Sequence, residues 1–223
     1  MLLHGQPGSG REWCRVIDAL GDSVDAVAPD RPGYGDNPLP AGGVAENVDW
    51  LERQLEADGG RAPPLVVGHS WAGSMVLGLA RRRPDLVRGL VLVGSVGPGA
   101  ITRMDRVMGH PAVGSLADRW EARVTRPVRR TPAALLAFLA EQRSLVRDLP
   151  AVVDGLEGIT APAIVLAGTR DHIVQPSIAE ALAARLPNAE LVSVPGGGHR
   201  LHRTHPQLVA RVVRRGLAKS PRT

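Results

Sequence analysis

Cysteine, aromatic residues and lysine are scarce in this 223-residue sequence, and the first two scarcities each exclude a class of protein. A single cysteine, Cys14, cannot build an internal disulfide framework and favours a reducing compartment such as the cytoplasm. Aromatic residues make up 3% of the chain, too few for a nucleic-acid platform of stacked rings. Lysine occurs once, at Lys219, so the net charge of +5 is carried by arginine. The arginines lie among acidic residues, which is typical of solvated helix faces rather than of a nucleic-acid surface.

Long apolar segments are also scarce. The first residues contain no apolar stretch long enough for a signal peptide, so we expect a cytoplasmic protein. Residues 62–80 contain no Asp, Glu, Lys or Arg, a length compatible with a membrane span. This stretch is interrupted by Pro63-Pro64 and Gly68-His69-Ser70, which favour a strand, a sharp turn and a helix. We therefore expect no membrane partner and no nucleic-acid partner.

Short aliphatic runs alternate with longer amphipathic segments, and this alternation predicts an α/β fold with a mostly parallel sheet flanked by helices. Near-continuous apolar runs are typical of strands that are covered on both faces. We expect strands over Val24–Ala28, Pro64–Gly68, Leu90–Gly94, Ala163–Gly168 and Ala189–Val194. We expect helices over Arg11–Leu20, Val44–Ala57, Trp71–Arg83, Ser177–Leu186 and Pro206–Leu217.

One segment, residues 99–158, interrupts the alternation: it shows helical stretches such as Pro132–Val146 and no clear strand. We interpret it as a helical cap inserted into a core formed by residues 1–98 and 159–223. The cap contains four large apolar side chains, which either line a substrate pocket or form the core of the cap itself: Met104, Met108, Trp120 and Phe138.

The motif Gly68-His69-Ser70-Trp71-Ala72-Gly73 directly follows the aliphatic run Leu65-Val66-Val67. A serine between a strand and a helix, with small residues two positions before and after it, predicts a strained elbow that exposes the hydroxyl. Ser70 is then a candidate nucleophile near the positive end of the following helix. The alternative is that Ser70 only caps that helix, because serine is a favoured N-cap.

Here the sequence resembles the α/β-hydrolase family, over nearly the whole chain. Ala72 departs mildly from the family's GxSxG pattern. Four further segments resemble the family's loops in the family's order: His4-Gly5-Gln6-Pro7-Gly8, Asp30-Arg31-Pro32-Gly33-Tyr34-Gly35, Gly168-Thr169-Arg170-Asp171 and Gly198-His199. The order Ser70, Asp171, His199 is that of α/β-hydrolases and differs from the orders of the two common serine-protease folds.

The resemblance implies a role for each of these residues. Ser70 would be the nucleophile, His199 the base that takes its proton, and Asp171 the acid that orients the imidazole. The backbone amides of Gln6 and Trp71 would form the oxyanion hole.

We expect no cofactor and no metal. His199, His202 and His205 are spaced by three residues, but no carboxylate lies close to them in the sequence and the HExxH pattern of zinc sites is absent. We therefore expect His202 and His205 to be exposed loop or cap residues.

Only Met1-Leu2-Leu3 precede His4, whereas family members have two strands and most of a third before this loop. We expect a truncated start, with the N-terminal strands missing and one sheet edge uncovered. An uncovered edge can recruit other chains, so self-association through it is expected.

The motifs together predict a serine hydrolase that cleaves a carboxylic ester of a small or medium-sized acid through an acyl-enzyme intermediate. A serine nucleophile disfavours the dehalogenase branch of the family, which uses an aspartate at this position. Two alternatives stay open: hydrolysis of an amide, thioester or carbon-carbon bond with the same triad, and a non-catalytic ligand-binding protein on a hydrolase scaffold. The substrate is expected to be a small molecule.

Overall fold

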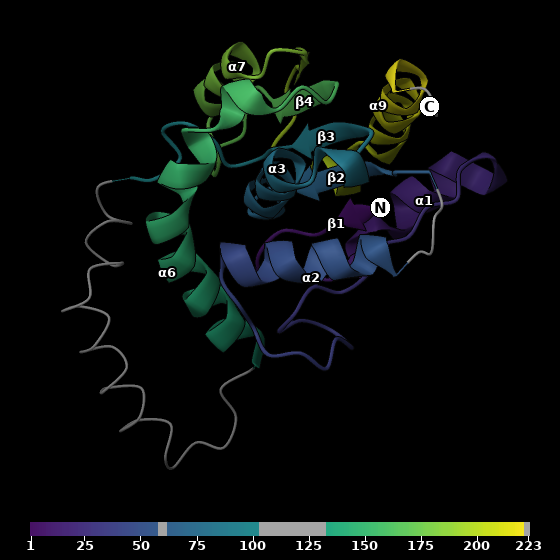
Figure 1. Cartoon of the computed structure of the whole chain (residues 1–223). Helices are drawn as coiled ribbons and strands as arrows, with labels where there is room; N and C mark the ends of the chain where they lie inside the picture. The colour runs from purple at the N-terminus through teal and green to yellow at the C-terminus, as the bar shows by residue number, and fades with distance from the viewer. Residues whose placement is uncertain (58–61, 103–132, 221–223) are drawn as a thin grey trace, which may run out of the picture.

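The computed structural model describes residues 1–57, 62–102 and 133–220 (Figure 1). Within these residues, five parallel strands form one sheet whose spatial order follows the chain order. The strands are β1 (Leu2–Leu3), β2 (Leu65–His69), β3 (Gly89–Val93), β4 (Ala163–Gly168) and β5 (Ala189–Val194). Because all five run in the same direction, their carboxyl ends meet at one edge, where this fold class places its ligands.

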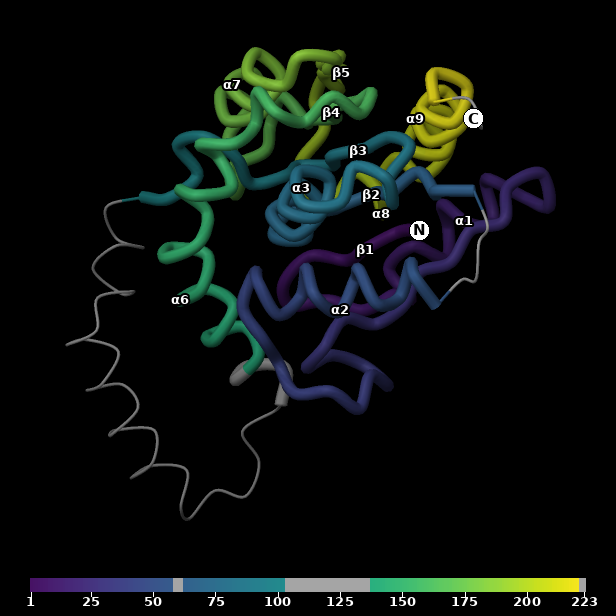
Figure 2. The backbone as a smooth tube through the Cα atoms, viewed as in Figure 1, coloured from purple at the N-terminus to yellow at the C-terminus, as the bar shows by residue number. Residues whose placement is uncertain are grey.

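Helices cover both faces of the sheet (Figures 1 and 2). One face carries α2 (Val44–Glu56), α3 (Ala72–Arg82), α6 (Ala133–Val153) and α7 (Pro176–Arg185). The other carries α1 (Cys14–Leu20), α8 (Leu201–Thr204) and α9 (Pro206–Lys219). Short 3-10 helices lie at Gly10–Trp13, Gly21–Ser23, Pro84–Leu86 and Leu156–Gly158.

The sequence of β3 shows why two apolar layers form. Successive side chains of a strand point to opposite faces, so Leu90 and Leu92 belong to the apolar layer under α3, and Val91 and Val93 to the layer under α9. All four side chains are fully buried. The run therefore needs no polar residue, and the sheet is a rigid base for the loops at its carboxyl edge.

Most expected elements are confirmed: the four strands from β2 to β5 and the helices α2, α3, α7 and α9 lie within two residues of their predicted bounds. The strand expected over Val24–Ala28 is wrong. This segment runs beside β1, and the Leu2 amide donates a hydrogen bond to the Val27 carbonyl over 2.8 Å. With a neighbour only two residues long, no regular ladder forms, and the Val27 side chain is 51% exposed. Self-association through this edge stays a prediction.

The expected cap segment contains α6, which begins within one residue of the predicted helix and extends to Val153. Met104, Met108 and Trp120 lie outside the described residues, and the boundaries of the cap stay a prediction. In the described ranges, no helix is both long and apolar enough to cross a membrane.

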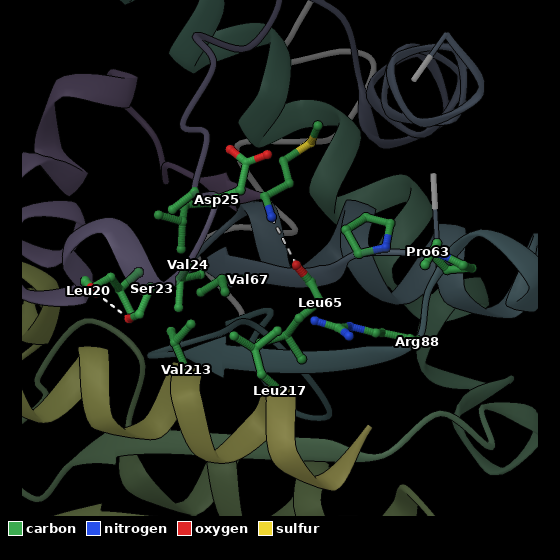
Figure 3. A pocket seen from close by; sticks show the side chains of 15 residues that line it. Leu20, Ser23, Val24, Asp25, Pro63, Leu65, Val67, Arg88, Val213 and Leu217 are labelled. Atoms are coloured by element: carbon green, nitrogen blue, oxygen red, sulfur yellow. Dashed lines mark hydrogen bonds between the residues drawn. The ribbon is translucent and has the colours of Figure 1, made fainter. Parts of the chain in front are cut away.

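A cavity of about 510 Å³ lies at the amino ends of the strands (Figure 3). Its walls include Leu20 and Val24 on one side and Val213 and Leu217 of α9 on another. Leu65, the first residue of β2, also lines it, whereas the candidate nucleophile follows the opposite end of that strand. The cavity is therefore remote from the site described below.

Candidate active site

Ser70 occupies the elbow between β2 and α3, as expected. Its φ angle is +54°, in the left-handed region that few residues other than glycine adopt. The turn is fixed by two backbone hydrogen bonds, from the Ser70 amide to the Val93 carbonyl and from the Gly73 amide to the Ser70 carbonyl, both 3.0 Å long. Strain of this kind is typical of functional sites, where surrounding structure holds one residue in place.

Three side chains form a continuous hydrogen-bonded chain across the carboxyl edge of the sheet. The Nε2 atom of His199 lies 2.9 Å from the Ser70 hydroxyl oxygen, and its Nδ1 atom lies 2.8 Å from Asp171 Oδ2. Ser70 follows β2, Asp171 follows β4 and His199 follows β5, so three parallel strands bring together residues up to 129 positions apart. The structure thus brings together all three residues that the sequence singled out.

The Asp171 carboxylate is buried and fixed on both oxygens. Oδ2 faces the imidazole, and Oδ1 accepts hydrogen bonds from the amides of Ile173 and Val174, each 2.9 Å long. Space beside the pair comes from Gly94, with φ +50°, where a Cβ atom would lie 3.2 Å from His199 Nδ1. An acid held this way fixes the tautomer of the imidazole and stabilises its protonated form.

A buried histidine supports the loop that carries His199. The His69 ring packs at a tilt of 47° against the His199 ring with centroids 4.8 Å apart, and its Nε2 atom lies 3.1 Å from the His199 carbonyl oxygen. Burial, together with the nearby His202 and His199, holds the pKa of His69 well below its usual value. His69 is therefore neutral near pH 7 and adds no positive charge beside the candidate base.

The two expected oxyanion residues flank the serine. Trp71 follows Ser70 directly, and Gln6 follows Gly5, where a Cβ atom would lie 3.0 Å from Ser70 Cβ. In the part of the chain that the structure describes, neither backbone amide donates a hydrogen bond to a protein acceptor. Trp71 is fully buried and Gln6 half-buried, and two backbone amides without a protein partner beside Ser70 suit an incoming oxyanion.

His4 fixes the start of the Gln6 loop. Its Nδ1 atom lies 2.8 Å from the Gly5 carbonyl oxygen, and its Nε2 atom accepts a hydrogen bond from the Arg31 amide over 3.0 Å. Burial and the neighbouring Arg31 guanidinium lower the pKa of His4 to about 4. This histidine is neutral at pH 7, as both of its hydrogen bonds require.

Arg31 is fully buried beneath this loop, and each of its five N–H groups has an acceptor. Nε donates to the His4 carbonyl and Nη2 to the Gly5 carbonyl, both over 2.9 Å. Nη1 donates to Asn47 Oδ1 over 3.3 Å, and both terminal nitrogens bond the Glu141 carboxylate. A guanidinium that is shielded from solvent destabilises a fold unless its charge is paired and its N–H groups are hydrogen-bonded, as they are here.

Glu141 lies on α6 and joins the same network. Its carboxylate accepts a hydrogen bond from the Tyr34 hydroxyl over 2.7 Å, and its backbone carbonyl accepts one from Trp71 Nε1 over 3.1 Å. Burial raises the pKa of the Glu141 carboxyl, and Arg31 and Tyr34 oppose that shift. The Arg31 guanidinium also lies 4.6 Å from the centroid of the Trp71 ring.

The sequence did not single out Arg31 or Glu141 as partners. Their contact spans 110 positions of the sequence, and nothing next to either residue distinguishes it from the other charged residues of the chain. The only local signal was the place of Arg31 in the loop motif that starts at Asp30.

The expectation of an exposed His202 is wrong. Its ring is fully buried and packs between Trp13 and His69, with centroids 4.9 and 4.3 Å away. Its Nε2 atom lies 3.4 Å from a Glu12 carboxylate oxygen. His202 became buried because α8 folds back over the 3-10 helix at Gly10–Trp13, a contact between distant segments.

Three histidines are spaced by three residues in the sequence, and a shared metal ion would require their rings to meet. His199, His202 and His205 do not converge: the first faces Asp171, the second faces Glu12 and the third bonds Thr204. Among the described residues, Glu12, His69 and His202 form a candidate group, with ligand atoms up to 4.8 Å apart. Tetrahedral zinc ligands lie about 3.4 Å apart, so we assign no ion to this group. The expected absence of a metal stays a prediction.

Comparison with known proteins identifies the family of the chain. The profile of the Alpha/beta hydrolase family matches residues 1–212, so the chain belongs to that family and is a hydrolase by its class. It is 28% identical to a 2-hydroxymuconate semialdehyde hydrolase of Pseudomonas putida, over 87% of this chain and 77% of the relative. It is 24% identical to a haloalkane dehalogenase of Bradyrhizobium diazoefficiens, over 96% of this chain and 84% of that relative.

Solved structures show the same fold. A thermophilic esterase of Thermogutta terrifontis superposes with a TM-score of 0.76 at 23% identity, covering 98% of this chain and 89% of the esterase. At this identity the likeness concerns the fold alone.

Proposed function

We propose that this protein is a serine hydrolase that cleaves a carboxylic ester of a small or medium-sized acid. The observation that carries the proposal is the hydrogen-bonded chain from Ser70 through His199 to Asp171. A serine at the elbow disfavours the dehalogenase reaction, although one relative is a dehalogenase, because that branch requires an aspartate nucleophile.

The geometry supports a two-step reaction. Ser70 Oγ attacks the ester carbonyl carbon as His199 Nε2 takes the hydroxyl proton, and the carbonyl oxygen becomes an oxyanion facing the amides of Gln6 and Trp71. The bond to the alcohol then breaks, and the alcohol leaves with the proton from His199. Water attacks the acyl-serine in the same way, giving the acid and free Ser70.

The first test is the Ser70→Ala variant. The change removes one oxygen at the elbow, so the fold should persist while hydrolysis of short p-nitrophenyl esters falls by several powers of ten. The matched control is Ser193→Ala, which removes an exposed hydroxyl from β5 and should leave the rate unchanged. More than about a tenth of wild-type turnover in Ser70→Ala would refute the assigned nucleophile.

A fluorophosphonate probe separates this proposal from a ligand-binding role. Such probes react only with an activated serine, so the wild-type chain should label at Ser70 and the Ser70→Ala variant should not. A folded wild-type chain that never labels would favour a non-catalytic binding protein.

A second candidate is hydrolysis of a bond other than an ester. It is favoured by the 28% identical relative, whose name states that it hydrolyses 2-hydroxymuconate semialdehyde. The same Ser70 and His199 would serve this reaction. Assaying that compound beside the p-nitrophenyl esters, with Ser70→Ala in both assays, decides between the two candidates.

A further inference from the structure

We propose that one turn of α6, at Glu141 and Gln142, positions both halves of the oxyanion hole. The inference rests on the proposed function, because it assigns a task to residues that do not touch the substrate. Glu141, Gln142 and Arg31 are positioning residues in this proposal, and the amides of Gln6 and Trp71 make the contact.

The first observation is that both oxyanion residues hold the same turn of α6 with their side chains. Gln6 Nε2 donates to Gln142 Oε1 over 2.5 Å, and Trp71 Nε1 donates to the Glu141 carbonyl over 3.1 Å. Gln6 lies after β1 and Trp71 after β2, so no local segment connects them. Two consecutive residues of one helix therefore fix the spacing of two loops.

The second observation concerns the orientation of the Gln6 amide. In a trans peptide unit, the carbonyl oxygen and the following N–H point in opposite directions within one plane. Arg31 Nη2 donates a hydrogen bond to the Gly5 carbonyl oxygen over 2.9 Å, and His4 Nδ1 lies 2.8 Å from the same oxygen. With its carbonyl held by Arg31, this peptide unit presents the Gln6 N–H on the opposite side.

The third observation is that Glu141 holds Arg31 itself. The carboxylate engages both terminal nitrogens of the guanidinium, and the side chains of both residues are fully buried. A fork with two contacts fixes direction as well as distance. The order of contacts therefore runs from Glu141 through Arg31 to the Gly5–Gln6 peptide.

These contacts give α6 a task in the chemical step. An oxyanion donor contributes only when it lies about 2.7–3.1 Å from the developing charge. Loosening the turn of α6 should therefore slow the chemical step while leaving ground-state binding of the ester nearly intact.

The test uses two variants on the full chain. Gln142→Leu removes the contact to Gln6, and Glu141→Gln removes the charge that holds Arg31. Because removing one donor costs about 100-fold to 1,000-fold, we expect a misplaced donor to lower kcat roughly 10-fold or more, with KM changed less than about two-fold. The control is Arg147→Gln on the same helix, where a side chain 69% exposed pairs only with Asp148 among the described residues.

A second readout separates positioning from stability. A trifluoromethyl ketone forms an anionic tetrahedral adduct with the serine, and its affinity should fall by the same factor as kcat. Adding Gln142→Leu to Gln6→Ala should cost nothing further, because the first change has already removed the contact. A lower melting temperature with unchanged kcat and unchanged ketone affinity in both variants would overturn the inference.

If Glu141→Gln does not fold, Gln142→Leu still decides the question, because its side chain is only half-buried. Failure of the proposed function is seen separately, as activity that persists in Ser70→Ala. An enzyme that needs Ser70 but is indifferent to Gln142 and Glu141 keeps the proposed function and loses this inference.

Discussion

Acid should destabilise this protein through His4, and the size of the effect follows from its burial. The ordinary pKa of 6.5 falls to about 4 in the folded chain. Between these two pH values the unfolded chain binds a proton at His4 that the folded chain excludes. The contribution of His4 to the free energy of unfolding is therefore fully present above about pH 6.5 and decreases as the pH falls towards 4. The full shift corresponds to about 3 kcal/mol, of which about 2 kcal/mol is lost between pH 7 and pH 5.

The measurement is urea unfolding followed by tryptophan fluorescence at pH 7 and pH 5, for the wild type and for His4→Gln. The amide can donate and accept but cannot titrate, so the variant should lose about 2 kcal/mol less than the wild type between the two values. Part of the pH dependence should persist in the variant, because the pKa of His69 is also lowered. His172→Gln removes an exposed imidazole and controls for the loss of one histidine. Equal losses in His4→Gln and the wild type would refute the assignment.

Two further predictions concern the site. Asp171→Asn should keep the fold and lower kcat by about 10⁴, because an amide facing Nδ1 holds His199 in the wrong tautomer; circular dichroism and ester turnover check this, and a loss below ten-fold would contradict it. Gly5→Ala places a Cβ atom 2.8 Å from His69 Nδ1 and 3.0 Å from Ser70 Cβ, so we expect about 1–3 kcal/mol of destabilisation and slower turnover. Gly158→Ala, where a Cβ would meet nothing within 4 Å, is the matched control, and equal behaviour of the two variants would contradict the steric argument.

The sheet and the elbow were predictable because their signals are local. The run Leu90-Val91-Leu92-Val93 is typical of a strand covered on both faces, and the small residues around Ser70 predict the turn directly. Cys14 shows the limit of this reasoning. Its apolar neighbours Trp13, Val16 and Ile17 favour a buried side chain, but the helix turns Cys14 outwards and the cysteine is exposed.

The network around Arg31 was beyond prediction for a different reason. Which charges are buried depends on which distant elements pack together, and neither Arg31 nor Glu141 carries a local mark of its burial. The same applies to His202, whose burial depends on the packing of Trp13 and His69. Long-range contacts determine whether these side chains are buried, and hydrophobic periodicity along the sequence does not predict such contacts.

The position of Lys219 has a practical consequence for handling the protein. This only lysine of the sequence pairs with Glu190 near the end of α9, and its neighbour Ser220 lies beside Gly89, the first residue of β3. The amine is therefore at the opposite end of the sheet from Ser70. Coupling through this lysine amine would thus attach the chain to a bead or sensor surface in one orientation, with the elbow facing the solution.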